Sequence, residues 1–326
     1  MNILLLLPEI LAFKKERALQ QQYLTSTIKP EIAKLENDWG ESLDKYLKHK
    51  IFNYYALYVP VVIGQSFARL YGRDLSAKEK RLLTLLGIVT PFFDDFFDIE
   101  KLSQEQIKDF VLHPFDAKPS TLMQKAFTEY GKEIVSTIPD KNFFYEISMH
   151  VFEAQIGSAQ QEDPAIDIKT NKLLAQQKGG YSLLFYYTAM DVPVSETVQD
   201  VVYKTGALLQ LSNDIFDVYK DIQKDIYTLV RNYDDITLLK EYYREQYSAL
   251  VKQAYSLPFS KKNIDAYLRR SQFLFAMTFV GLNQLISLKK RKGSQIDWKT
   301  CTRQELVCDA EKFSVQMRWL RQLMSL

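Results

Sequence analysis

The stretch Pro91–Asp98 contains three aspartates among four phenylalanines, in the order Pro-Phe-Phe-Asp-Asp-Phe-Phe-Asp. At about 100° per residue, a helix places Asp94 and Asp98 on one face, with Asp95 beside them and the phenylalanines opposite. Neighbouring carboxylates repel one another, and a divalent cation removes that conflict. Hard ions such as Mg²⁺ prefer carboxylate oxygens. The spacing therefore indicates a magnesium site, with a solvated acidic stripe as the alternative.

The residues that precede this cluster favour the metal site. Leu82–Phe93 is nearly free of charge, and a helix that is apolar on all sides is buried. We therefore expect the three carboxylates to lie at the end of a core helix, where water is restricted and a cation is needed to balance their charge.

A second set of oxygen-bearing side chains lies further along the chain. Asn213, Asp217 and Asp221 have the spacing i, i+4, i+8, which places them on one helical face over two turns. Gly206, earlier on that face, leaves room for another group to approach the backbone. Taken alone, this pattern fits a metal site and a solvated face equally well, because two neighbouring lysines can pair with the acids.

The distance between the two clusters allows them to act together. Asn213 follows Asp94 by 119 residues, which is enough for intervening helices to return the chain antiparallel to its start. Metal and ligand sites in helical bundles are commonly built from facing helices. We therefore predict that Asp94 and Asn213 face each other across one cavity.

The two clusters resemble the metal-binding motifs of class I isoprenoid synthases, the superfamily of trans-prenyltransferases, squalene and phytoene synthases, and terpene cyclases. Asp94–Asp98 (DDFFD) is similar to their DDxxD motif. Asn213–Asp221 (NDIFDVYKD) is similar to the NDxxSxxxE motif of terpene cyclases, with Asp217 in place of Ser or Thr and Asp221 in place of Glu. Gln210 is similar to the Gln that precedes the second aspartate motif of prenyltransferases.

The resemblance covers about residues 92–228 and implies three Mg²⁺ ions that hold the diphosphate of an allylic substrate. The metal ligands that it implies are Asp94, Asp98, Asn213, Asp217 and Asp221. It also implies that Asp95 orients these ligands or pairs with a cation. Asp217 adds a negative charge where cyclases have a hydroxyl, which departs from an unmodified cyclase mechanism.

Diphosphate oxygens also require cations. Lys178 precedes Asn213 by 35 residues and is similar to a lysine that prenyltransferases have on the helix before the second motif. The other candidates for diphosphate binding are Lys220, Lys224 and Arg318, each of which also fits a solvated position. Gly179 and Gly180 predict a loosened or broken helix whose free carbonyls could face a carbocation.

The elements that must position these residues are helices. The chain has 20 Phe, 20 Tyr and 3 Trp beside only 11 Gly and 10 Pro, and it shows neither strict apolar/polar alternation nor a hairpin signal. Helical periodicity recurs, with breaks near residues 71–76, 113–119, 139, 162–167, 191–193, 257–260 and 291–294. We predict one all-α domain over residues 1–326, and the resemblance implies a class I isoprenoid-synthase bundle around a central cavity.

Composition and charge limit the partners. The formal charge of +2, from 42 Lys+Arg and 40 Asp+Glu, argues against a basic nucleic-acid-binding surface. No uninterrupted apolar run reaches the roughly 18 residues of a membrane span. With only Cys301 and Cys308, neither a disulfide framework nor a four-cysteine zinc site is available. We therefore expect a cytoplasmic protein without a membrane span, and a homodimer stays open.

These observations lead to three hypotheses on function. The first is a Mg²⁺-dependent terpene synthase, a lyase that ionises a linear prenyl diphosphate, cyclises or rearranges the carbocation and releases diphosphate. The second is a condensing prenyltransferase or a squalene/phytoene-synthase-like enzyme. Lys48–Ile51 and Ile99–Leu102 lack the Gly-Gly-Lys-x-x-Arg-Pro stretch and the arginine pair of chain-elongating enzymes, which disfavours elongation but not head-to-head coupling. The third is a non-catalytic isoprenoid-binding subunit.

Overall fold

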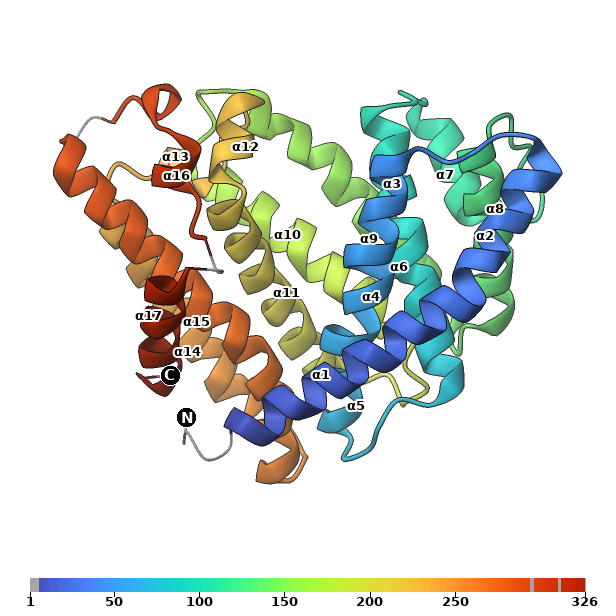
Figure 1. The fold of residues 1–326 in the computed structure, drawn as a ribbon, viewed down its shortest axis with the longest axis horizontal. Helices are drawn as coiled ribbons and strands as arrows, with labels where there is room; N and C mark the ends of the chain where they lie inside the picture. Colours follow the sequence, from blue (N-terminus) through green and yellow to red (C-terminus); the bar gives the residue numbers. More distant parts are fainter. Residues whose placement is uncertain (1–5, 294–295, 310–311, 326) are drawn as a thin grey trace. The chain divides into compact units, whose positions relative to one another are not determined.

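The computed structural model describes residues 6–293, 296–309 and 312–325, and all regular elements in these ranges are helical (Figure 1). The prediction of an all-α fold is therefore confirmed. The chain separates into two compact units. Unit 1 includes residues 150–184 and 194–326, and unit 2 consists of residues 6–149 and 185–193. The prediction of one domain over residues 1–326 stays a prediction.

Unit 2 contains eight α-helices in its described residues before α9, of which α6 is the longest. Its α-helices are α1 (Leu6–Tyr23), α2 (Lys29–Trp39), α3 (Lys45–Lys50), α4 (Ala56–Tyr58), α5 (Gln65–Leu70), α6 (Ala77–Asp98), α7 (Gln104–Leu112) and α8 (Leu122–Thr137). Three π-helical segments interrupt the first half: η2 (Leu24–Ile28), η3 (Ile51–Tyr55) and η4 (Val59–Gly64). Such segments are rare and often occur at functional sites.

Unit 1 contains the longest of the described helices, α15. Its elements are the 3₁₀ turns η5 (Ser158–Glu162) and η6 (Trp298–Thr300) and the helices α11 (Glu196–Phe216), α12 (Val218–Gln223), α13 (Leu229–Asn232), α14 (Ile236–Ala254), α15 (Lys261–Lys292), α16 (Arg303–Leu306) and α17 (Phe313–Ser325). The helices α9 (Lys141–Gly157) and α10 (Ile168–Tyr187) each have residues in both units.

Helix α6 is the core helix of unit 2. It starts at a capping box in which the Ser76 hydroxyl accepts from the Glu79 N–H, while the Glu79 carboxylate accepts from the Ser76 N–H. Leu82–Val89 is buried on all sides, as its uniformly apolar sequence predicts. At the far end, the Phe96 ring packs against those of Phe110 and Phe127, with centroids 5.6 and 5.0 Å away. The helix that carries the first aspartate cluster is thus held along its whole length.

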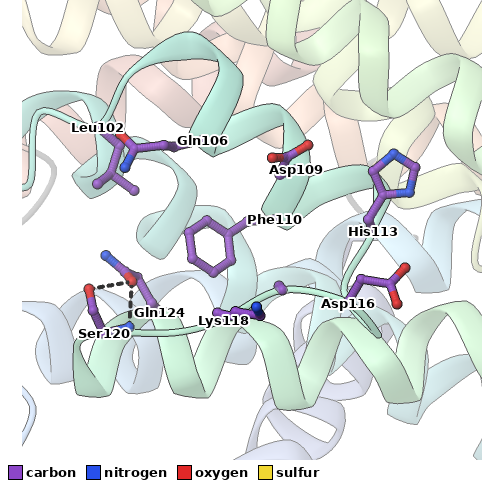
Figure 2. Close-up of a pocket in the computed structure, with 10 residues that line it drawn as sticks. Leu102, Gln106, Asp109, Phe110, His113, Asp116, Lys118, Ser120 and Gln124 are labelled. Carbon is purple, nitrogen blue, oxygen red and sulfur yellow. Dashed lines mark hydrogen bonds between the residues drawn. The ribbon is translucent and has the colours of Figure 1, made fainter.

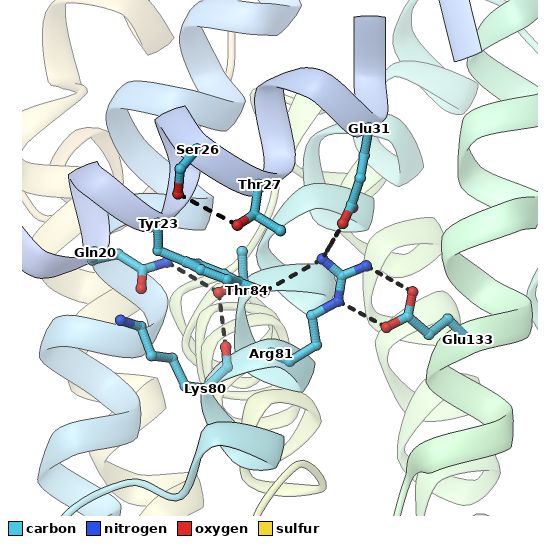
Figure 3. Close-up of polar contacts among 9 residues, drawn as sticks. All are labelled: Gln20, Tyr23, Ser26, Thr27, Glu31, Lys80, Arg81, Thr84 and Glu133. Atoms are coloured by element: carbon cyan, nitrogen blue, oxygen red, sulfur yellow. Dashed lines mark hydrogen bonds and ion pairs between the residues drawn. The ribbon is translucent and has the colours of Figure 1, made fainter. Parts of the chain in front are cut away.

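Polar contacts hold the first half of α6 against α1, α2 and α8 (Figure 3). The Arg81 guanidinium donates to the Glu31 carboxylate at 3.0 Å and to the Glu133 carboxylate at 2.7 and 2.8 Å. The Gln20 amide donates to the Thr84 hydroxyl at 3.0 Å. These contacts join helices that are far apart in sequence, and they fix the axis along which α6 runs toward its acidic end.

Helix α10 runs without interruption through Gly179 and Gly180, so the predicted break at this position is wrong. A Cβ on Gly179 would lie 2.2 Å from the Gly206 carbonyl oxygen, and a Cβ on Gly206 would lie 2.2 Å from the Gly179 carbonyl oxygen. A Cβ on Gly180 would lie 2.4 Å from the Tyr203 ring. The glycines therefore allow α10 and α11 to cross closely within unit 1, and they do not break the helix.

Helix α15 forms much of the core of unit 1, where it packs against α11, α14 and α17. In the described part of the chain, it alone is long and apolar enough to cross a membrane by length and composition. Its 18-residue apolar window is 56% buried within the protein, a pattern that the core helix of a globular unit also produces.

Candidate functional site

The first aspartate cluster occupies the last turn of α6, in unit 2. Asp94 is half-buried, Asp95 is only 2% exposed and Asp98 is exposed. Phe92 and Phe96 are fully buried on the other side of the helix. Because of this arrangement, the cluster presents two carboxylates outward and one inward.

Lys50, at the junction of α3 and η3, is the cation next to the inward carboxylate. Its Nζ lies 2.7 Å from Asp95 Oδ1 and 5.0 Å from the centroid of the Tyr46 ring. The other oxygen of Asp95, Oδ2, is buried without a hydrogen-bond partner among the described residues. The sequence led us to expect a cation near Asp95 but not its identity, since Lys50 lies 45 residues away and contacts α6 only through the tertiary fold.

A tyrosine hydroxyl lies near the outward carboxylates. The Tyr186 and Thr90 hydroxyls are 3.0 Å apart, and Tyr186 is buried. Burial raises the pKa of Tyr186, the Thr90 hydrogen bond partly offsets this, and the charge of Asp94 raises it further. Because the Thr90 hydroxyl donates to the Leu86 carbonyl at 2.8 Å, the neutral Tyr186 phenol donates its proton to the Thr90 oxygen.

The second cluster lies at the junction of α11 and α12, in unit 1. Helix α11 ends at Phe216, but the helical hydrogen-bond spacing continues, because Asp217 N donates to Asn213 O at 2.7 Å and Asp221 N donates to Asp217 O at 2.9 Å. Asn213 and Asp217 are exposed, and Asp221 is half-buried. The i, i+4, i+8 relation thus holds across the junction.

Asp214 is a buried carboxylate in this cluster that we did not single out from the sequence. Its Oδ1 accepts from Gln210 Nε2 at 2.9 Å, and its Oδ2 has no hydrogen-bond partner in the described part of the chain. Burial raises the pKa of Asp214 to about 6. Burial and the charges of Asp214 and Asp217 raise the pKa of Asp221 to about 7. The sequence signal was the i, i+4 relation between Gln210 and Asp214.

Lys178 is the cation of α10 that acts on this cluster. Its positive charge lowers the pKa values of Asp214 and Asp221, opposing the effect of burial. The residue directly after Lys178 is Gly179, so the close contact with Gly206 holds the lysine beside α11. Lys178 is therefore near enough to Asp214 and Asp221 for its charge to act on both carboxylates.

The other predicted cations occupy different positions. Lys220 Nζ lies 3.4 Å from Asp217 Oδ2, and both side chains are more than half exposed. Lys224 is exposed at the end of α12. Arg318 is exposed on α17, which packs against α15 (Figure 1). The Arg318 Nε donates to the Ser314 carbonyl at 3.3 Å, and its role in binding the substrate diphosphate stays a prediction.

The donor set of the two clusters fits magnesium that a phosphate ligand helps to hold. No group of three His, Cys, Asp or Glu side chains in the described ranges is gathered so as to hold a metal by itself. Mg²⁺ commonly takes one or two carboxylates and completes its shell with water and phosphate oxygens. Each cluster has one buried carboxylate oxygen, Asp95 Oδ2 or Asp214 Oδ2, without a hydrogen-bond partner among the described residues. Asp94 and Asn213 belong to different units, and their shared cavity stays a prediction.

A pocket of about 610 Å³ lies beside the acidic end of α6, within unit 2 (Figure 2). Phe110 points into its centre, and Asp109, His113 and Lys118 lie around it. The pocket is close to the first cluster, because the Phe110 ring packs against the ring of Phe96, which lies two residues before Asp98. No motif in the sequence predicted this pocket.

The chain matches no family model and no curated protein. The two motifs and the contacts around them are thus the basis for assigning a function.

Proposed function

We propose that the chain is a Mg²⁺-dependent terpene synthase of the class I type, which ionises a linear prenyl diphosphate, cyclises or rearranges the carbocation and releases diphosphate. The observation that carries this proposal is the second cluster: Asn213, Asp217 and Asp221 keep one register across two helices, with Lys178 beside them. An acidic stripe that only meets water does not need a lysine from another helix or a buried aspartate at its base.

The ligands of the ions would be Asp94, Asp98, Asn213, Asp217 and Asp221. Bound Mg²⁺ would neutralise the diphosphate and so make it a competent leaving group. Lys178 would bind diphosphate oxygens directly, and Lys220 and Lys224 are the further cations close to the cluster. Asp95, which Lys50 already neutralises, would position α6 rather than bind metal.

A condensing enzyme is the second candidate. Asp217 supplies a carboxylate where cyclases have a hydroxyl, and the preceding Gln210 is bonded to Asp214 as part of the same cluster. Both features are closer to the aspartate-rich second motif of prenyltransferases. Such an enzyme would join two isoprenoid diphosphates instead of cyclising one.

Incubation with single allylic substrates tests the proposal. The protein is supplied with Mg²⁺ and geranyl, farnesyl or geranylgeranyl diphosphate in parallel, and the products are analysed by gas chromatography and a diphosphate assay. We expect diphosphate release and a hydrocarbon or alcohol from one of these substrates, with no change when isopentenyl diphosphate is added. A longer linear diphosphate formed only with both substrates would identify a prenyltransferase, and a dimeric hydrocarbon a squalene-synthase-like enzyme.

A further inference from the structure

A hollow of about 210 Å³ lies between α15 and α17 in unit 1. Its lining residues are Val280, Asn283, Arg318, Arg321 and Gln322. Two guanidinium groups and two amides therefore surround a space several times the roughly 30 Å³ that one water occupies in the liquid. Of the described residues that line it, none is a carboxylate.

Packing fixes α17 so that its arginines border this hollow. Val315 is buried against Val280 and Cys308, and Trp319 packs against the same cluster. The Trp319 indole N–H also donates to the Phe273 carbonyl at 2.8 Å. These contacts hold α17 on α15, and the two arginines, whose side chains are exposed, border the hollow between the helices.

Helix α14 adds two more cations. Lys240 Nζ donates to Asn283 Oδ1 at 2.6 Å, which leaves the Asn283 amide nitrogen as a donor. Burial and the nearby charge of Arg244 lower the pKa of Lys240. The charged group that acts on Lys240 is thus another cation.

These four cations lack an anionic partner. Among the described residues, no carboxylate lies within ion-pair distance of Lys240, Arg244, Arg318 or Arg321. By contrast, Arg81 elsewhere in the chain pairs with two glutamates. Lys240 and Arg244 act on each other as like charges, and an anion bound beside Asn283 would relieve that repulsion.

We propose that the hollow formed by Asn283, Arg318 and Arg321, together with Lys240, binds a phosphate group. The planar fork of an arginine matches phosphate oxygens with two parallel hydrogen bonds. The amide nitrogen of Asn283 supplies a further donor. None of the magnesium ligands proposed above lines this hollow, so the site uses a different set of side chains.

The phosphate group has two potential sources. One is a small soluble anion such as inorganic diphosphate. The other is a phospholipid headgroup, because Phe313 and Met317 are 76% and 37% exposed and lie on the face of α17 that leads to Arg321 one turn later. The two sources share the same recognition chemistry, and the experiment below separates them.

Calorimetric titration with inorganic diphosphate in excess EDTA tests the site, because EDTA excludes binding through magnesium. We expect saturable binding by the wild type and at least tenfold weaker binding by the double variant Arg318→Gln/Arg321→Gln. Lys252→Gln/Lys262→Gln removes the same charge from exposed positions of unit 1 and should bind as the wild type does. If both double variants lose the same amount of diphosphate affinity, the effect depends only on net charge, and the proposal is overturned.

A second variant tests the site without removing its arginines. Asn283→Asp places a carboxylate next to Lys240 and in the hollow that Arg318 and Arg321 line, so it should raise the melting temperature and abolish diphosphate binding. A lower melting temperature together with unchanged binding would contradict the proposed charge arrangement.

Flotation with vesicles identifies the source of the phosphate. If the wild type binds phosphatidic acid vesicles but not phosphatidylcholine vesicles, and binding is lost with Arg318→Gln/Arg321→Gln, the ligand is a lipid headgroup. Diphosphate binding without flotation assigns the site to a soluble phosphate. The absence of both kinds of binding in the wild type would overturn the proposal, whatever the outcome of the terpene synthase assays.

Discussion

The Lys50 ammonium lies 2.7 Å from Asp95 Oδ1, and this ion pair joins the start of η3 to the acidic end of α6. Asp95 is 2% exposed, and its second oxygen has no partner among the described residues. A carboxylate in this position depends on its one cation, because a buried charge that loses its partner retains the full penalty of leaving water.

Lys50→Met should therefore lower the free energy of unfolding by about 3 kcal/mol. This is the low end for a buried pair, because 23% of the Lys50 side chain remains exposed. Urea denaturation measures the change. The control is Lys125→Met, which breaks the more exposed pair with Glu129 and should change stability by less than about 1 kcal/mol. Equal effects of the two substitutions would show that Asp95 does not rely on Lys50.

Gly206→Ala should destabilise the protein because its Cβ would lie 2.2 Å from the Gly179 carbonyl oxygen. Overpacking of this kind costs about 1–3 kcal/mol even though alanine is the better helix former. Gly157→Ala is the matched control, since its Cβ would meet only the end of the Leu174 side chain, at 3.3 Å. Thermal unfolding of both variants is the measurement, and a neutral Gly206→Ala would contradict the close crossing.

The raised pKa of Asp221, about 7, predicts a specific pH dependence in EDTA. Between about pH 4 and pH 7, the folded protein holds a proton that the unfolded chain has released, so the free energy of unfolding falls as pH rises. Asp221→Asn removes this penalty. Its stability relative to the wild type should therefore increase from pH 4 to pH 7 and level off above.

Asp235→Asn is the control, because its effect on stability should depend on pH in the opposite direction. Hydrogen bonds from Thr237 lower the pKa of Asp235, so its carboxylate stabilises the fold above its unfolded pKa and ceases to do so as pH falls. Denaturation at several pH values should show that Asp235→Asn lowers the free energy of unfolding less as pH falls. A constant difference between wild type and Asp221→Asn across this range would be evidence against a buried, protonated Asp221.

Asp94→Ala and Asn213→Ala should each reduce diphosphate release by at least about 100-fold, because loss of one ligand misplaces the leaving group. Both variants should keep the wild-type circular dichroism spectrum. Asp200→Ala, an exposed position on α11, is the control and should retain full activity. Wild-type rates in either ligand variant, or in excess chelator, would exclude the proposed magnesium site.

The sequence was informative where local composition decides the outcome. The charge-free run of α6 could only be a buried helix, and the spacing of Asn213, Asp217 and Asp221 survives in the hydrogen-bond pattern. The breaks expected near residues 71–76 and 113–119 also lie between helices in the structure.

The sequence was misleading where contacts between residues far apart in the chain determine the local structure. Gly179 and Gly180 are helix breakers in isolation, but packing against α11 stabilises the helix that contains them. Lys50 had no local signal, because the π-helical segments around it displace side chains from the usual 3.6-residue period. Asp214 was missed because its role follows from burial, which the i, i+4, i+8 pattern of its neighbours does not report.

The contact between Gly179 and Gly206 restricts how this chain can evolve. Each carbonyl oxygen occupies the place that a side chain on the other residue would require, so neither position can accept a larger residue until the two helices have moved apart. Such a movement would carry Lys178 away from Asp214 and Asp221 at the same time. Single substitutions at either glycine are therefore unfavourable. Descendants of this chain that keep Lys178 near Asp214 and Asp221 should keep both glycines.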